Sequence, residues 1–169
     1  DSQRSIKLFA ENGFGISTEH YAHSKTAIID LRDPFPEVLA HMPAKVRTNG
    51  KRADRIINSY RWTRFDAVSK TEQSDFFSLH DAWAKEKNIF GFSNHFLETV
   101  MLKFATSGWL VQAYTDDVLS GGMMVLIHDR VASYFYTCSS RLGRSTHIPT
   151  GMALHAMEYS QREGADIFD

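Results

Sequence analysis

The stretch Trp109–Cys138 reads WLVQAYTDDVLSGGMMVLIHDRVASYFYTC and decides the fold. It contains three apolar runs: Trp109–Thr115, Leu119–His128 and Ala132–Cys138. Short polar turns at Asp116-Asp117 and at Asp129-Arg130 join these runs. Strands joined by links this short pair antiparallel, because a parallel crossover needs about a dozen residues. The stretch therefore predicts a three-stranded antiparallel meander.

The residues after the meander predict a parallel step. A polar loop, Ser139–Ile148, is followed by Pro149, which the first turn of a helix tolerates. The helix ends before Gly164, and Ala165–Asp169 has the pattern of another strand. A helical crossover of this length makes the strands on either side of it parallel.

The residues before the meander predict two further strands and four helices. The strands are expected at Thr26–Leu31 and Arg61–Val68. Between them, Pro43 should separate a short helix from a basic helix that ends near Asn58. Two more helices follow, capped by Ser74 and by Ser93, and Gly108 should end the second. The prediction is an α/β (α+β) domain, a mixed sheet with helices on both faces.

Composition narrows the class of protein. The chain of 169 residues is 43% hydrophobic with a net charge of -1, which suits a single folded domain. Cys138 is the only cysteine, which fits a reducing compartment, so we expect a cytoplasmic protein. The sequence contains no run of 18 apolar residues, so no membrane span is expected. The pair His20 and His23 lacks a partner pair at zinc-ligand spacing, so no metal is expected.

The loop Ser139–Ile148 is the candidate binding site. It follows the strand at which the sheet changes from antiparallel to parallel, and ligands of open α/β sheets bind at such a point. Arg141, Gly143 and Arg144 lie in this loop, and Thr150 and Gly151 begin the helix after it. Arginine side chains and a helix N-terminus favour an anion such as a pyrophosphate.

These motifs together resemble the GNAT superfamily of acyltransferases, and more closely its Fem-like and CelD/BioF-like branch. A strand, a pyrophosphate loop and a helix form the signature region of that superfamily; they match Ala132–Cys138, Arg141–Thr150 and Gly151–Glu163. The branch is also similar in Ile28–Leu31 before a helix and in Gly164–Asp169 after one. The resemblance implies one acyltransferase domain, with an N-terminal strand and helices over residues 1–58 and a core over 61–169. It also implies final strands after Asp169, so we expect a chain cut at its C-terminal end.

The resemblance also implies the chemistry. An acyl-thioester such as acetyl-CoA would donate its acyl group to a small-molecule or peptide amine, with backbone N–H groups of Cys138 and Ser139 near the reacting carbonyl. Tyr136 would protonate the leaving thiolate, and Asp169 would orient or deprotonate the amine. Strand alternation places Tyr134 and Tyr136 on one face. The alternative for Tyr136 is a packed aromatic residue, and for Asp169 a residue that bonds backbone at the strand end.

Two other functions stay open. Between Lys45 and Arg64 seven basic residues stand against Asp54 alone, which is typical either of a solvated helix face or of a phosphate-binding surface. Five of them are candidates for binding tRNA in a Fem-like aminoacyl transfer: Lys45, Arg47, Lys51, Arg52 and Arg55.

The glycine of Arg141-Leu142-Gly143-Arg144 stands one position earlier than in the usual GNAT loop. A catalytically inert binding module is therefore the third hypothesis.

Overall fold

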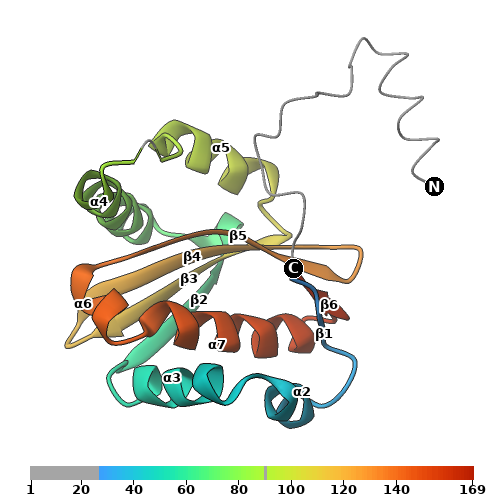
Figure 1. The fold of residues 1–169 in the computed structure, drawn as a ribbon. Helices are drawn as coiled ribbons and strands as arrows, with labels where there is room; N and C mark the ends of the chain where they lie inside the picture. Colours follow the sequence, from blue (N-terminus) through green and yellow to red (C-terminus); the bar gives the residue numbers. More distant parts are fainter. Residues whose placement is uncertain (1–26, 90) are drawn as a thin grey trace, which may run out of the picture.

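The computed structural model describes residues 27–89 and 91–169, which form a mixed sheet with helices on both faces (Figure 1). Among these residues the sheet has six strands in the order β1-β6-β5-β4-β3-β2. They are β1 (Ile29–Asp30), β2 (Ser59–Arg64), β3 (Gly108–Thr115), β4 (Val118–His128), β5 (Val131–Ser139) and β6 (Ile167–Phe168). The helices are α2 (Phe35–His41), α3 (Ala44–Asp54), α4 (Lys70–Lys87), α5 (Asn94–Lys103), α6 (Arg141–Ser145) and α7 (Ile148–Arg162), with a 3-10 turn η1 (Phe65–Ala67). The predicted fold class is confirmed.

The pairing of the strands follows from their turns. Strands β2 to β5 pair antiparallel in chain order, and β6 pairs parallel with β5 and antiparallel with β1. The turn residues Asp116 and Asp117 have φ of 48° and 61°, and Asp129 and Arg130 have φ of 48° and 65°. Positive φ at both central residues matches the twist of a two-residue hairpin. The predicted meander and the parallel step are both confirmed.

Two apolar cores lie on opposite faces of the sheet. Helix α7 covers one face, with α3 and α2 beside it, and α4 and α5 cover the other (Figure 1). Met123 packs in the core under α7, while Met124 packs against Phe76 under α4. Successive side chains of a strand point to opposite faces, so β4 must be apolar on both. This central strand holds the two layers together.

The glycine pair in β4, Gly121 and Gly122, lies where side chains of both helical layers come close to the strand. A Cβ added at Gly121 would stand 2.5 Å from Met152 Sδ, and one at Gly122 would stand 2.5 Å from Phe76 Cδ2. The register between β3 and β4 also shifts between Ala113 and Tyr114.

Two predicted helix ends are wrong. Helix α4 is capped by Ser69, because its Oγ accepts from Glu72 N while the Glu72 carboxylate accepts from Ser69 N. Ser74 therefore lies inside the helix. Helix α5 does begin after Ser93 but ends at Lys103, and Gly108 instead opens β3. A Cβ there would stand 2.2 Å from the Phe65 ring, so packing explains this glycine.

Three other boundaries differ from the prediction. The basic helix α3 ends at Asp54 rather than near Asn58, and β2 gives way to η1 after Arg64. The predicted loop Ser139–Ile148 contains the short helix α6, because Ser140 Oγ accepts a capping bond from Gly143 N at 3.0 Å. His20 and His23 lie outside the described residues.

Candidate functional site

The parallel pairing of β5 and β6 is short, and beyond it the edge of β5 has no strand partner among the described residues. Only Val131 and Ala132 are paired with β6 residues. Two further backbone bonds extend the contact: Asp169 N donates to Ala132 O at 2.8 Å, and Tyr134 N donates to Asp169 O at 2.7 Å. Beyond these bonds, the edge of β5 at Phe135, Tyr136 and Thr137 is not paired with β6.

A cavity of about 470 Å³, here called the split cavity, lies where β5 and β6 part. Strand β5 contributes Tyr134 and Phe135 to its lining, and Asp169 stands at the end of β6. Helix α7 closes it from below with Ala153 and Met157. The predicted residue Asp169 thus lies in this cavity, which is mainly apolar.

A bulge in β5 corrects the expectation that Tyr134 and Tyr136 share one face. Val125 of β4 is paired with Tyr134 but Met124 with Tyr136, so Phe135 has no partner of its own on β4. The extra residue reverses the alternation of the strand. Tyr134 consequently packs in the core under α7, while Phe135 and Tyr136 pack on the α4 side.

Tyr136 forms a short hydrogen bond with a buried histidine of α4. The Tyr136 hydroxyl lies 2.5 Å from His80 Nδ1, and His80 Nε2 lies 2.8 Å from the Phe92 carbonyl oxygen. A carbonyl oxygen only accepts, so His80 Nε2 carries a proton. In the tautomer with this single ring proton, Nδ1 accepts a hydrogen bond from the Tyr136 hydroxyl. Burial raises the pKa of Tyr136 well above its ordinary range. The sequence did not indicate the hydrogen bond between His80 and Tyr136, because the two residues are 56 positions apart.

The end of β5 places the predicted residues Cys138 and Ser139 in the protein interior. Their exposed fractions are 1% and 3%. Burial raises the pKa of the Cys138 thiol to about 12. A thiol held neutral at physiological pH is a poor nucleophile, so Cys138 acts in the core as a small apolar residue.

Cys138 should resist alkylation in the folded protein. We expect no labelling by iodoacetamide at pH 8 and complete labelling after unfolding in urea. The thiolate forms only as the pH approaches the folded pKa of about 12, whereas an unfolded thiol ionises around pH 9. Mass spectrometry reads the result from the only cysteine in the chain. Rapid labelling at pH 8 with an unchanged circular dichroism spectrum would contradict the buried position.

The three residues predicted in the loop, Arg141, Gly143 and Arg144, lie in different environments on α6. Arg144 is already paired: its Nη1 donates to Ser139 O at 2.5 Å and its Nη2 binds Glu86 of α4. Gly143 packs on β4, where an added Cβ would stand 2.4 Å from Ser120 O. Arg141 is exposed on α6.

Thr150 and Gly151 lie in the first turns of α7. The N–H groups of both donate to His147 O, at 2.9 and 3.2 Å. Gly151 also lets α3 approach, since an added Cβ would stand 2.7 Å from Ala53 Cβ. Both backbone donors are therefore used within the helix, and an anion there would depend on side chains.

Arginines from α3 supply such side chains beside the start of α7. A second cavity of about 350 Å³, here called the basic cavity, is lined by Arg52, Arg55, Ile56, Ser145, Thr146 and His147. Both arginines are exposed, and neither guanidinium group has a hydrogen bond or ion pair with a described residue. The basic helix and the candidate anion loop, which looked like separate features of the sequence, meet in this cavity. Helix α3 packs antiparallel on α7, with Gly50 beside Leu154 and Ala53 beside Gly151, and this packing brings the two features together.

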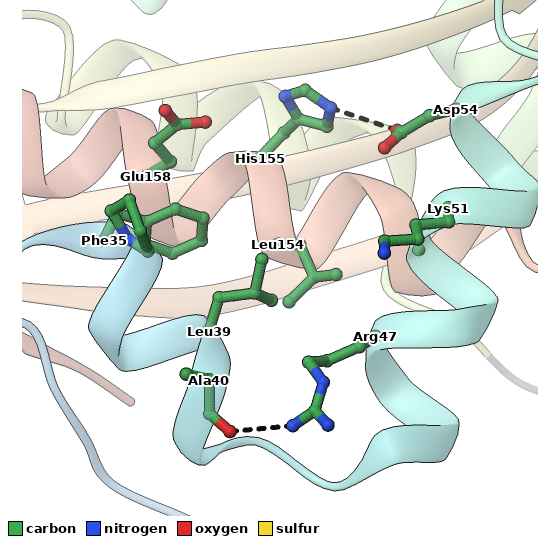
Figure 2. A pocket seen from close by; sticks show the side chains of 11 residues that line it. Phe35, Leu39, Ala40, Arg47, Lys51, Asp54, Leu154, His155 and Glu158 are labelled. Carbon is green, nitrogen blue, oxygen red and sulfur yellow. Dashed lines mark hydrogen bonds and ion pairs between the residues drawn. The ribbon is translucent and has the colours of Figure 1, made fainter.

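The remaining basic residues of α3 face elsewhere. A groove of about 590 Å³ lies between α2, α3 and α7. Leu39 and Leu154 are among the residues that line it (Figure 2). Arg47 lies at one end, where its Nη1 donates to Ala40 O at 2.7 Å (Figure 2). Lys51 also lines the groove, and Lys45 is exposed at the start of the helix. The five basic residues therefore divide between two cavities and the solvated surface.

Neither a metal site nor a membrane helix is found in the described part of the chain. In residues 27–89 and 91–169, no three His, Cys, Asp or Glu side chains are grouped as metal ligands would be. In the same ranges no helix combines the length and apolar character that crossing a bilayer requires.

Comparison with solved structures identifies the fold. FemX superposes with a TM-score of 0.70 at 11% identity, over 84% of this chain and 51% of FemX. The lysylphosphatidylglycerol synthetase from Bacillus licheniformis gives a TM-score of 0.60 at 12% identity, over 84% of this chain and 42% of that one. The chain thus spans about half the length of these proteins. Models of known protein families and sequences of curated proteins give no match.

An acetyltransferase of the GNAT family from Staphylococcus aureus Mu50 is also similar. Its TM-score is 0.51 at 10% identity, over 63% of this chain and 70% of that protein. The chain therefore has the GNAT fold, with a more extensive likeness to FemX than to the staphylococcal acetyltransferase.

Proposed function

We propose that this chain is an N-acyltransferase that moves an acyl group from an acyl-thioester, such as acetyl-CoA, to an amine. The observation that carries the proposal is the parting of β5 and β6 over the split cavity, because it leaves a strand edge free at the switch point of a GNAT fold. Backbone N–H groups on that edge are suited to hold the donor and its developing oxyanion.

The transfer step uses the pair Tyr136 and His80 as a proton relay. The neutral amine attacks the acyl carbon, a C–N bond forms and the C–S bond breaks to release a thiolate. The amine proton passes to the Tyr136 oxygen as the phenolic proton moves to His80 Nδ1, and the imidazolium then returns a proton to the thiolate through Tyr136. This route follows the direction of the existing hydrogen bond, since Tyr136 already donates to His80. Asp169, which lines the split cavity, would orient the amine.

An extended donor would reach from the split cavity to the basic cavity. Ala153 of the split cavity and His147 of the basic cavity are six residues apart along α7, about 9 Å at the helical rise. The unpaired guanidinium groups of Arg52 and Arg55 are suited to bidentate bonds with a pyrophosphate. We therefore assign the anionic end of the donor to these arginines together with Arg141, whereas Arg144 mainly holds α6 against α4.

A thermal-unfolding titration tests this assignment. Acetyl-CoA, a longer acyl-CoA and desulfo-CoA should each raise the melting temperature, with a stabilisation of about 2.7 kcal/mol at a hundredfold excess over Kd. The double variant Arg52→Ala/Arg55→Ala should weaken binding about a hundredfold or more, because it removes two charge-assisted bonds of about 1.5–3 kcal/mol each. Arg141→Ala measures the share of the third arginine.

Lys45→Ala is the matched control. It removes a charge from the same helix, ten residues before Arg55 and so about 15 Å away. Acyl-CoA binding should be unchanged in this variant. A melting curve of the wild-type protein that none of the three ligands shifts would exclude acyl-CoA as the donor.

The second candidate is a Fem-like transfer from aminoacyl-tRNA. It is favoured by the extent of the likeness, which covers 84% of this chain for FemX but 63% for the staphylococcal acetyltransferase. Transfer RNA binding should decline steeply with added salt, and Lys45→Ala should weaken it along with Arg52→Ala. Acyl-CoA, with only a few charges, should show neither effect. A sample that binds neither class of donor would support an inert binding module.

A further inference from the structure

Three phenylalanines form an exposed surface beside the split cavity. Phe92 and Phe96 are 45% and 41% exposed. The ring centroids of Phe92 and Phe96 are 4.7 Å apart, and the Phe92 ring lies nearly parallel to that of Phe135, at 7° and 6.0 Å. We call Phe92, Phe96 and Phe135 the aromatic surface. Apolar side chains that form a contiguous exposed group are typical of a binding site.

The aromatic surface is continuous with the proposed reaction centre. Phe135 lines the split cavity and also stacks on Phe92 and Phe96. The next residue, Tyr136, bonds His80, and the other nitrogen of His80 holds the Phe92 carbonyl at 2.8 Å. One buried histidine therefore fixes both the proton relay and the segment that carries Phe92.

A carboxylate stands at the margin of this surface. Asp81 follows His80 on α4 and its side chain is 65% exposed, with Oδ1 at 3.9 Å from His80 Nε2. Asn94 Nδ2 donates to its other oxygen at 3.0 Å, which orients the group. A protonated amine is attracted both by such a carboxylate and by the faces of aromatic rings.

We propose that the aromatic surface and Asp81 form the acceptor subsite, and that the acceptor is a primary amine carried on a flat aromatic body. This inference rests on the proposed acyl transfer. The ring of the acceptor stacks on Phe92 and Phe96, and Asp81 attracts its ammonium group toward Tyr136. The ammonium group releases one proton to solvent, and the neutral amine attacks the acyl carbon held along β5. A C–N bond forms and the C–S bond breaks, and the second amine proton reaches the released thiolate through Tyr136 and His80.

Three probe compounds separate the two parts of the subsite. 2-Phenylethylamine has the ring and the charge, n-hexylamine lacks the ring, and 2-phenylethanol lacks the charge. Calorimetric titration without any acyl donor should show that 2-phenylethylamine binds tighter than either relative by about tenfold or more. Equal affinity for all three compounds, or no binding of 2-phenylethylamine, would overturn the proposal.

Variants assign the effect to residues. Phe92→Ala and Phe96→Ala should each weaken 2-phenylethylamine about tenfold, and Asp81→Asn should weaken it without affecting 2-phenylethanol. Leu102→Ala is the control, because Leu102 is also on α5 and is 72% exposed, but lies outside the aromatic surface. Phe96→Ala keeps the test open if Phe92→Ala does not fold, since Phe96 lies one turn into α5.

The binding and transfer assays distinguish the failure of this inference from the failure of the proposed function. Tight binding of 2-phenylethylamine with no acylation from any acyl-CoA would leave the subsite in place and remove the donor assignment. Acylation of 2-phenylethylamine with the same KM in wild type, Phe92→Ala and Phe96→Ala would overturn the subsite and keep the transfer.

Discussion

Replacing Tyr136 with phenylalanine is expected to slow acyl transfer by about 10²- to 10⁴-fold, the range that a positioned acid–base group contributes. The variant keeps the ring that packs edge-on against Phe76 and removes only the hydroxyl bonded to His80. The amine then has no route by which its proton reaches His80. The rate is followed as release of the CoA thiol from acetyl-CoA with 2-phenylethylamine as acceptor, and the loss should lie in kcat more than in KM.

A lower rate of the Tyr136→Phe variant must be distinguished from the effect of a loss of structure. Tyr136→Phe leaves His80 Nδ1 buried without its partner, at a cost of about 1–3 kcal/mol in the free energy of unfolding. Tyr159→Phe is the matched control, since Tyr159 lies on α7 with its ring stacked on Trp62 and away from the split cavity. It should retain full activity. If the folded Tyr136→Phe variant keeps full activity, the hydroxyl has no part in the transfer step and is only a structural partner of His80.

His80→Asn distinguishes a relay from mere positioning. Asparagine can still accept a hydrogen bond from Tyr136 but cannot take its proton near neutral pH. If the proton moves to His80, this variant should be slowed about as much as Tyr136→Phe, by about 10²-fold or more. Activity within a few-fold of wild type would show that the histidine only orients the tyrosine.

The course of the chain was predictable from the sequence because its signals are local. The aspartates at Asp116 and Asp129 mark tight turns, and Pro149 and Gly164 bound the helix that makes the parallel step. Each signal acts within a few residues of itself. The order of the strands and helices, and the direction in which they pair, follow from these signals and the lengths between them.

The candidate site was less predictable because it depends on contacts between distant segments. From the sequence, Arg144 is an unpaired cation in a loop. In the structure it pairs with Glu86, which lies 58 residues earlier on α4. Arg52 meets His147 only because α3 packs closely on α7, through Gly50 and Gly151, whose added Cβ atoms would clash with the opposite helix. The two helical glycines were the one signal in the sequence that pointed to this contact.

The bulge at Phe135 shows why strand alternation is a weak guide to the face on which a side chain lies. Nothing in the run Ser133–Thr137 distinguishes the bulged residue, since all candidate positions are polar or aromatic. The register is set by β4 on the other side, where Val125 and Met124 pair with Tyr134 and Tyr136. One extra residue transfers a tyrosine from one core to the other, and here it brings Tyr136 to His80.

Gly122→Ala is expected to lower the free energy of unfolding by about 2–3 kcal/mol, the cost of an overpacked core. The added methyl group would stand 2.5 Å from Phe76 Cδ2 and 2.8 Å from Cε2. Phe76 is fully buried, with its ring beside those of Phe77 and Tyr136, so it has little room to move aside. Urea unfolding followed by circular dichroism measures the loss.

A smaller side chain at position 76 should recover part of that loss, which makes the contact itself testable. Phe76→Leu alone leaves space in the core and destabilises, but Gly122→Ala partly fills that space. The double variant should therefore be more stable than the sum of the single effects by about 1 kcal/mol or more. Gly121→Ala is the control, because its methyl group would point to the opposite face, toward Met152. Its effect should simply add to that of Phe76→Leu, since the sheet separates the two sites. If both glycine variants show the same coupling energy with Phe76→Leu, the coupling arises from a general change in β4 and not from direct contact between positions 76 and 122.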